Sequence, residues 1–145
     1  MVLMELIKTN EELVDVCKSI SKEKFITIDT EFIREKTYWS KLCLIQICTH
    51  NKEIIIDPLE NNIDLKPFIK ILNKKSILKI LHSGRQDIEI FYKMSGKIPK
   101  PIFDTQIAAM VCGFGESVGY EKLVDKILNK KIDKSSRFSN WAKRP

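Results

Sequence analysis

The sequence contains few of the residues that build zinc and other soft-metal sites. It has two histidines and four cysteines among 145 residues, and Cys17, Cys43, Cys48 and Cys112 form no C-x-x-C pair and adjoin no histidine cluster. A zinc site is therefore not expected. Cys43 and Cys48 lie an odd number of positions apart on one predicted strand, so they should face opposite sides and cannot easily pair. Reduced, mostly buried thiols are typical of a cytoplasmic protein.

Long apolar segments are also missing. No stretch approaches the ~18 consecutive apolar residues of a membrane span. The start, Met1 to Lys8, contains Glu5 and has neither the basic residues nor the apolar run of a secretory signal. We therefore expect no membrane attachment. A length of 145 residues, 43% of them hydrophobic, fits one compact domain with its own core.

Positive charge is concentrated near the end of the chain. The sequence has 25 Lys and Arg against 19 Asp and Glu, a net charge of +6. Residues 121–145 hold eight Lys and Arg but three Asp and Glu, and so account for five of these charges. Such a segment favours a polyanionic partner, because bound phosphates release condensed counterions. A solvated helix and tail is the alternative on charge alone.

Hydrophobic periodicity predicts a mixed α/β domain. β-branched and aromatic residues predict three strands, and a four-residue link between the second and third permits only an antiparallel hairpin. A further strand that is reached through a helix is usually parallel to its neighbour. Ser83 and Gln86 form a capping box for the next helix, which should turn Ile88, Phe91 and Tyr92 inward. The predicted strands are 25–32, 42–48, 53–57, 77–81 and 102–103; the predicted helices are 10–20, 63–72, 83–94, 105–112 and 120–128; and 129–145 is predicted as an exposed tail.

Three acidic residues are the candidates for chemistry. Alternation along strand 25–32 places Asp29 and Glu31 on the same face, about 6.5–7 Å apart, which allows both to reach one pair of divalent ions. An ordinary solvent-facing strand gives the same pattern. Asp87 lies in the first turn of the helix that follows strand 77–81, where it either binds metal or favours the positive end of the helix dipole.

Six segments together resemble the exonuclease domain of ribonuclease D. They occur in the order and spacing of that family and are Asp29-Thr-Glu-Phe32, Leu44-Ile-Gln-Ile47, Ile56-Asp-Pro58, His82-Ser-Gly-Arg-Gln-Asp87, Phe103-Asp-Thr-Gln-Ile107 and Trp141-Ala-Lys-Arg-Pro145. The resemblance implies a ribonuclease H-like fold, with three antiparallel strands followed by parallel ones. It also implies a 3'-5' exoribonuclease that trims RNA with a single-stranded 3' end, such as transfer RNA precursors.

The resemblance also implies a two-metal mechanism. Asp29 would bridge two Mg²⁺ or Mn²⁺ ions, Glu31 would bind the ion that activates water, and Asp87 would hold the second ion. The family carries a further Tyr-x-x-x-Asp motif shortly beyond the position of Pro145. Tyr120 is not that tyrosine, because Val124 follows it four positions later. We therefore expect a C-terminally incomplete domain over 1–145 that is weak or inactive alone and that a separate polypeptide could complete.

Several other residues are candidates for substrate contact. Tyr38 and Trp39 could stack on a terminal base or pack in the core, while Arg85 and Lys36 could touch phosphates. Asp104 could support the acidic residues or cap the helix after it. A silent remnant that binds RNA or a partner, and a DNA exonuclease of the same superfamily, are the alternative functions. The full set of predicted substrate contacts is Thr30, Phe32, Tyr38, Trp39, Gln46, His82 and Arg85.

Overall fold

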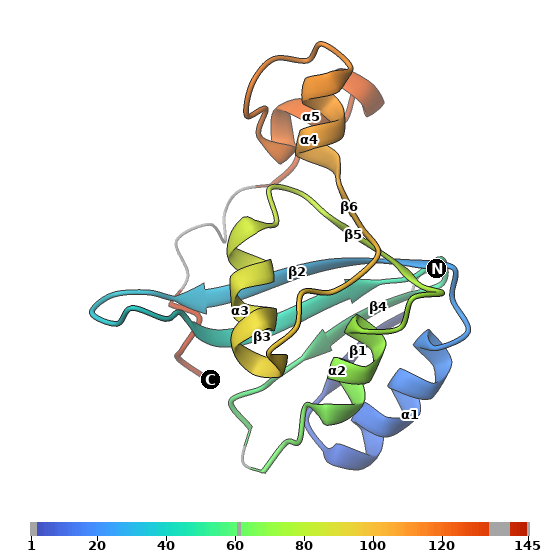
Figure 1. Ribbon diagram of the computed structural model, residues 1–145, viewed down its shortest axis with the longest axis vertical. Coiled ribbons are helices and arrows are strands. Elements are labelled where there is room, and N and C mark those ends of the chain that lie inside the picture. The colour runs from blue at the N-terminus through green and yellow to red at the C-terminus, as the bar shows by residue number, and fades with distance from the viewer. Residues whose placement is uncertain (1–2, 61, 134–139, 145) are drawn as a thin grey trace.

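The described part of the chain forms a six-stranded sheet with five helices (Figure 1). This computed structural model describes residues 3–60, 62–133 and 140–144. Part of the predicted tail, residues 134–139 and 145, lies outside the described residues. The elements are β1 Leu3–Ile7, α1 Asn10–Ile20, β2 Phe25–Ile33, β3 Lys41–Cys48, β4 Lys52–Ile56, α2 Lys66–Leu72, β5 Leu78–Leu81, α3 Arg85–Ser95, β6 Ile102–Asp104, α4 Thr105–Val111 and α5 Tyr120–Leu128.

The strand order is β1-β4-β3-β2-β5-β6. β2 pairs antiparallel with β3, and β3 pairs antiparallel with β4, which confirms the predicted meander. β5 pairs parallel with β2, and β6 pairs parallel with β5, which confirms the parallel second half of the sheet. The sequence analysis missed β1, which pairs parallel with β4 at the edge. Its pairing is long-range, so residues 3–7 show no hairpin signal of their own.

The two faces of the sheet differ in their contacts. Ile26 and Ile28 of β2 are buried, whereas Phe25, Thr27 and Asp29, which alternate with them, are exposed. The buried face packs against α1, α2 and α3 and forms the main core. Cys43 is buried while Cys48 is exposed, as expected for opposite faces of one strand. The expectation that most thiols are buried is wrong, because Cys112 is exposed as well and two of the four thiols, Cys17 and Cys43, are buried.

A buried lysine connects the loop between α2 and β5 with the loop before β6. The Lys79 side chain, in β5, is fully buried. Its Nζ donates to the carbonyl oxygens of Lys74 at 2.9 Å, Ile77 at 2.8 Å and Lys100 at 2.8 Å. Burial lowers the pKa of Lys79 to about 8. The ammonium group thus gives a donor to the Ile77 and Lys100 carbonyls. It is a second donor to the Lys74 carbonyl, which also accepts from the Ile77 N–H at 3.2 Å.

An ion pair fastens residues 141–144 to the body of the domain. Arg144 donates from Nε and Nη2 to the two carboxylate oxygens of Asp57, each at 2.6 Å, and Nη2 also donates to the Cys43 carbonyl at 2.9 Å. The Asp57 side chain is 3% exposed. A two-point contact of this kind fixes direction as well as distance, so the segment around Trp141 is held beside the ends of β3 and β4.

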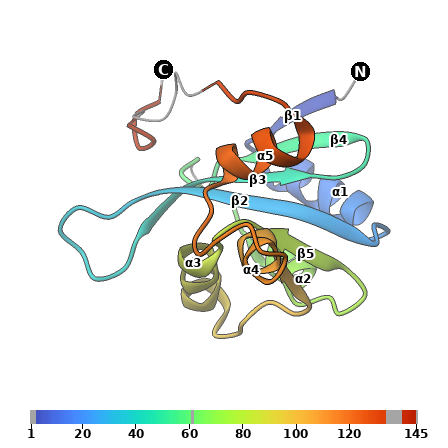
Figure 2. The same ribbon diagram turned by 90° about the horizontal axis from the view of Figure 1, so that it is seen from above.

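Helices α4 and α5 form a lobe at one end of the sheet, joined to it through β6 (Figure 1). The lobe has a small core of its own, made by Ala109, Val118 and Leu123 with Phe114 against them. Viewed from above, the hairpin between β2 and β3 projects at the side (Figure 2). No helix within the described ranges is long and apolar enough to cross a bilayer.

Candidate active site

Asp29 and Glu31 lie on the face of β2 opposite the main core, as the alternation predicts. Asp29 pairs with Gln46 and Glu31 with Leu44 of the neighbouring strand β3. The register shifts between Glu31 and Phe32, immediately after the second carboxylate. A shift of this kind bends a strand and redirects its side chains, and it recurs beside active sites.

Asp87 reaches the same segment from helix α3. Its side chain is 7% exposed, and its Oδ1 accepts hydrogen bonds from the backbone N–H of Thr30 at 3.1 Å and from the Thr30 hydroxyl at 2.5 Å. Thr30 lies between Asp29 and Glu31 in the strand. The third acid therefore contacts the residue that separates the first two, although it is 57 positions from Thr30 in the sequence.

The three carboxyl groups influence one another electrostatically. Burial raises the pKa of Glu31 to about 7, with the charges of Asp29 and then Asp87 as further causes. Burial and the charge of Asp87 raise the pKa of Asp29, while nearby His82 lowers it. Burial also raises the pKa of Asp87, against the hydrogen bonds from Thr30, which lower it. Burial is the largest cause of the raised pKa in all three groups, and the charges of neighbouring carboxylates add to it.

These residues suit a hard divalent cation. All three supply carboxylate oxygens, the ligands that Mg²⁺ and Mn²⁺ prefer, and a bound cation would relieve their mutual repulsion. In the described part of the chain, no three His, Cys, Asp or Glu side chains are grouped closely enough to form a ready-made metal site. The three acids thus influence one another through their charges but do not form a preassembled metal site.

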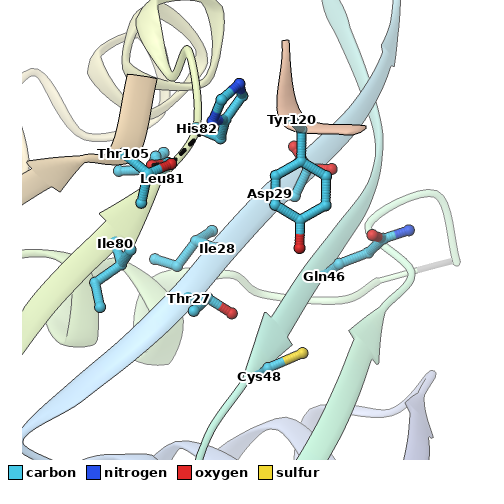
Figure 3. Close-up of a pocket in the computed structure, with 10 residues that line it drawn as sticks. All are labelled: Thr27, Ile28, Asp29, Gln46, Cys48, Ile80, Leu81, His82, Thr105 and Tyr120. Atoms are coloured by element: carbon cyan, nitrogen blue, oxygen red, sulfur yellow. Dashed lines mark hydrogen bonds between the residues drawn. The ribbon is translucent and has the colours of Figure 1, made fainter. Parts of the chain in front are cut away.

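A cleft of about 550 Å³ adjoins Asp29 (Figure 3). His82 stands at its edge, where its Nδ1 lies 2.9 Å from the Thr105 hydroxyl, and its ring meets the Tyr120 ring edge to face at 5.4 Å between centroids. The residues that line the cleft are Thr27, Ile28, Asp29, Gln46, Cys48, Ile80, Leu81, His82, Thr105 and Tyr120. A concave, mainly apolar space with a few polar groups is typical of a ligand site.

Tyr120 is one of the cleft residues that sequence reasoning missed. Its failure to fit the Tyr-x-x-x-Asp pattern removed it from consideration, yet it stands at the start of α5 and lines the cleft together with Asp29 and Gln46 (Figure 3). No local pattern signals this position, because it depends on how the α4–α5 lobe meets the sheet.

The predicted substrate contacts do not lie together. Gln46 and His82 line the cleft with Asp29. Thr30 is buried, with its hydroxyl engaged by Asp87, and Phe32 packs against the main core. Arg85 is exposed on α3 and forms an ion pair with Glu89, in which Nε lies 3.4 Å from Oε1.

Tyr38 and Trp39 lie on the projecting β2–β3 hairpin and do not line the cleft (Figure 2). Their rings meet edge to face, with centroids 5.1 Å apart. Tyr38 is 78% exposed and Trp39 42%, so core packing, one of the two expected roles, is wrong for this pair.

The predicted capping box at Ser83 is also wrong. Helix α3 has Gly84 as its N-cap with no side-chain hydrogen bond, and Ser83 has a positive φ of 56°. The inward face of α3 is formed by Asp87, Ile90 and Phe91. Tyr92 is exposed, so Asp87 and Ile90 take the inward positions that were predicted for Ile88 and Tyr92.

Comparison with known proteins defines the class. The 3'-5' exonuclease family profile matches residues 4–145. The chain is 46% identical to the ribonuclease D of Bartonella henselae over 143 residues, 99% of this chain and 35% of that protein. It superimposes on the crystal structure of Escherichia coli ribonuclease D with a TM-score of 0.91 and 38% identity, covering 97% of this chain and 37% of the other. A Trypanosoma brucei ribonuclease D solved in complex with RNA U12 shares the fold, with a TM-score of 0.81 at 17% identity and coverage of 93% and 50%.

The fold and these comparisons thus define a nuclease with a ribonuclease H-like mixed sheet, as predicted. The chain belongs to the 3'-5' exonuclease family, and its similarity is to the ribonuclease D members of that family. It spans about a third of the length of the first two relatives named above.

Proposed function

We propose that this chain carries the acidic half of the active site of a ribonuclease D-like 3'-5' exoribonuclease. Asp29, Glu31 and Asp87 are the catalytic residues and hold two Mg²⁺ or Mn²⁺ ions when these bind. The supporting observation is the contact of Asp87 with Thr30, which lies between the other two acids. The raised pKa values of all three carboxyl groups support it independently.

The bound ions would supply a nucleophilic water and stabilise the leaving oxygen of a phosphodiester. The side chains of this chain have other tasks. Thr30 holds the Asp87 carboxylate in one orientation through two hydrogen bonds. His82 places a potential positive charge beside Asp29, where it lowers the pKa of that carboxyl group. Both interactions favour ionised acids, which is the state that binds metal.

The substrate in this proposal is RNA with a single-stranded 3' end, including transfer RNA precursors. The Escherichia coli relative is described as an exoribonuclease involved in structured RNA processing, and the Trypanosoma brucei relative was solved with RNA. Tyr38 and Trp39 offer exposed rings on which bases can stack. The positive charge of residues 121–145 suits the phosphate backbone. A cytoplasmic location accords with these substrates.

We further propose that the acids work together with a Tyr-x-x-x-Asp helix, the further motif that the resemblance to ribonuclease D implies, packed on the same face of the sheet. The sheet face that carries Asp29 also exposes Phe25, Met4 and Leu6, so apolar surface is present for such a helix to cover. A catalytically silent RNA-binding remnant is the second candidate. The observation that favours it is the lack, in the described residues, of a ready-made metal-ligand group.

One assay separates these functions. Purified chain is incubated with Mn²⁺ and a 5'-labelled RNA that has a single-stranded 3' extension, with and without the polypeptide that follows Pro145 in longer relatives. We expect stepwise shortening from the 3' end that is strongest in the mixture and is lost in Asp29→Asn. Glu53→Gln, an exposed acid on β4, is the matched control. RNA binding without shortening in either sample would establish the remnant, and preferential cleavage of a matched DNA would indicate a DNA exonuclease.

A further inference from the structure

The Asp104 carboxylate accepts more hydrogen bonds than a helix cap requires. Its Oδ1 accepts from the backbone N–H of Gln106 at 2.8 Å, which is the N-cap bond of α4. It also accepts from the N–H of Ser83 at 3.0 Å, and its Oδ2 accepts from the N–H of Gly84 at 2.9 Å. Two of the three donors thus belong to the turn between β5 and α3. Burial alone would raise the pKa of Asp104, but these hydrogen bonds lower it overall, so the group is a carboxylate near neutral pH.

That turn is conformationally restricted. Ser83 adopts the left-handed region with φ of 56°, which is uncommon for a residue with a side chain. A Cβ on Gly84 would lie 2.7 Å from Cβ of Leu81, so the backbone there approaches Leu81 closely. Such a conformation persists when surrounding contacts determine it, and the Asp104 carboxylate supplies two of those contacts.

Thr105 contacts Leu81 and His82, the two residues that precede Ser83 in the same turn. Its hydroxyl donates to the Leu81 carbonyl at 3.1 Å and lies 2.9 Å from Nδ1 of His82. Because the hydroxyl hydrogen points to Leu81, His82 Nδ1 is the donor in the second contact. Asp104 and Thr105 together therefore bind every residue from Leu81 to Gly84.

We propose that Asp104 is a positioning residue for Asp87, which it orients by fixing the turn from which helix α3 starts. This inference rests on the proposed role of Asp87 as a metal ligand. Asp87 is in the first turn of α3, three residues after Gly84. A displaced turn shifts the first helical residues with it, and the Asp87 carboxylate then leaves the two Thr30 donors that hold it.

Asp104→Ser separates positioning from capping. Serine caps a helix about as well as aspartate, so the bond to Gln106 is kept, but a single hydroxyl oxygen cannot also accept from Ser83 and Gly84. We expect faster hydrogen exchange at the Thr30 amide and Mn²⁺ binding weakened by about 10-fold, the lower end of the effect of residues that orient metal ligands. Calorimetry of the full chain with Mn²⁺ gives the affinity, and NMR gives the exchange rate.

Thr9→Ala is the matched control, because it removes the capping box of α1 with Glu12, on another helix. It should lower Tm without changing Mn²⁺ affinity or exchange at Thr30. If Asp104→Ser fails to fold, Asp104→Asn, which keeps one acceptor oxygen and the cap, takes its place with an intermediate effect. Wild-type exchange at Thr30 in the folded variant overturns the proposal. Absence of Mn²⁺ binding to the wild-type chain defeats the proposed function instead, and Thr30 exchange still decides the role of Asp104.

Discussion

Thr30 donates twice to a single oxygen of Asp87, once from its backbone and once from its hydroxyl. The pair joins strand β2 to helix α3 beside Asp29 and Glu31. A carboxylate that accepts two bonds on one oxygen keeps the other oxygen available for a further partner. The contact therefore acts on both the stability of the fold and the orientation of a candidate metal ligand.

Thr30→Val tests the hydroxyl half of this contact. Valine keeps the shape of the side chain but removes the donor, so the buried Asp87 carboxylate loses a short hydrogen bond. We expect the free energy of unfolding to fall by about 1–3 kcal/mol, as measured by urea denaturation. Thr27→Val, at an exposed position of the same strand, should change it by less than about 0.5 kcal/mol. Equal effects at the two positions would argue against the contact.

Glu31 should make the metal-free chain less stable as pH rises. Its pKa of about 7 exceeds the ordinary value of 4.5, so between these values the folded chain retains a proton that the unfolded chain has released. The free energy of unfolding therefore falls as pH rises through that window. We expect a difference of about 1–2 kcal/mol between about pH 5 and about pH 8, discounted for partial solvent exposure.

Glu31→Gln removes this titration and should flatten the pH dependence, with urea denaturation in a chelator as the measurement. Glu53→Gln, on the exposed face of β4, should leave the dependence as it is in the wild type. Added Mg²⁺ should stabilise the wild type more at the higher pH, because ionised carboxylates bind the cation. A wild-type chain whose stability rises over this pH range would contradict the assignment.

Lys79→Met should be among the most destabilising single changes. Methionine fills similar space, but three backbone carbonyls lose the ammonium donor that they share. We expect a loss of about 2–4 kcal/mol in the free energy of unfolding. Lys75→Met, exposed in the neighbouring turn, provides the comparison and should be close to neutral. Thermal unfolding followed by circular dichroism distinguishes the two outcomes.

Arg144→Met should release residues 141–144 and leave the Asp57 carboxylate buried without its cation. Burial alone would raise the pKa of Asp57, but the hydrogen bond from Arg144 lowers it overall. The pair therefore stabilises the fold above the ordinary carboxyl pKa and loses its effect as pH falls through the lowered value. At neutral pH we expect a cost of about 2–4 kcal/mol, measured by urea denaturation. Lys143→Met, an exposed neighbour, should cost little.

Local patterns explain how much of the fold was predictable. The alternation of Ile26, Ile28 and Thr30 with Asp29 and Glu31 fixed the faces of β2, because a strand repeats every two residues. Edge strand β1 was missed because its pairing depends on β4, far along the chain. The start of α3 was misplaced because Ser83 adopts a positive φ in a turn whose N–H groups bond to Asp104, a residue from a later part of the chain. The position of Tyr120 likewise depends on the docking of a whole lobe.

One face of β2 packs in the main core and the other faces solvent or the cleft, so neighbouring positions of the strand affect different properties. Substitutions at Ile26 and Ile28 alter the main core and hence the temperature at which the chain unfolds. Substitutions at Phe25 and Thr27 meet solvent or the cleft and leave that core untouched. Selection can therefore change the cleft contact at Thr27 while the main core, and the thermal stability that depends on it, stays almost constant.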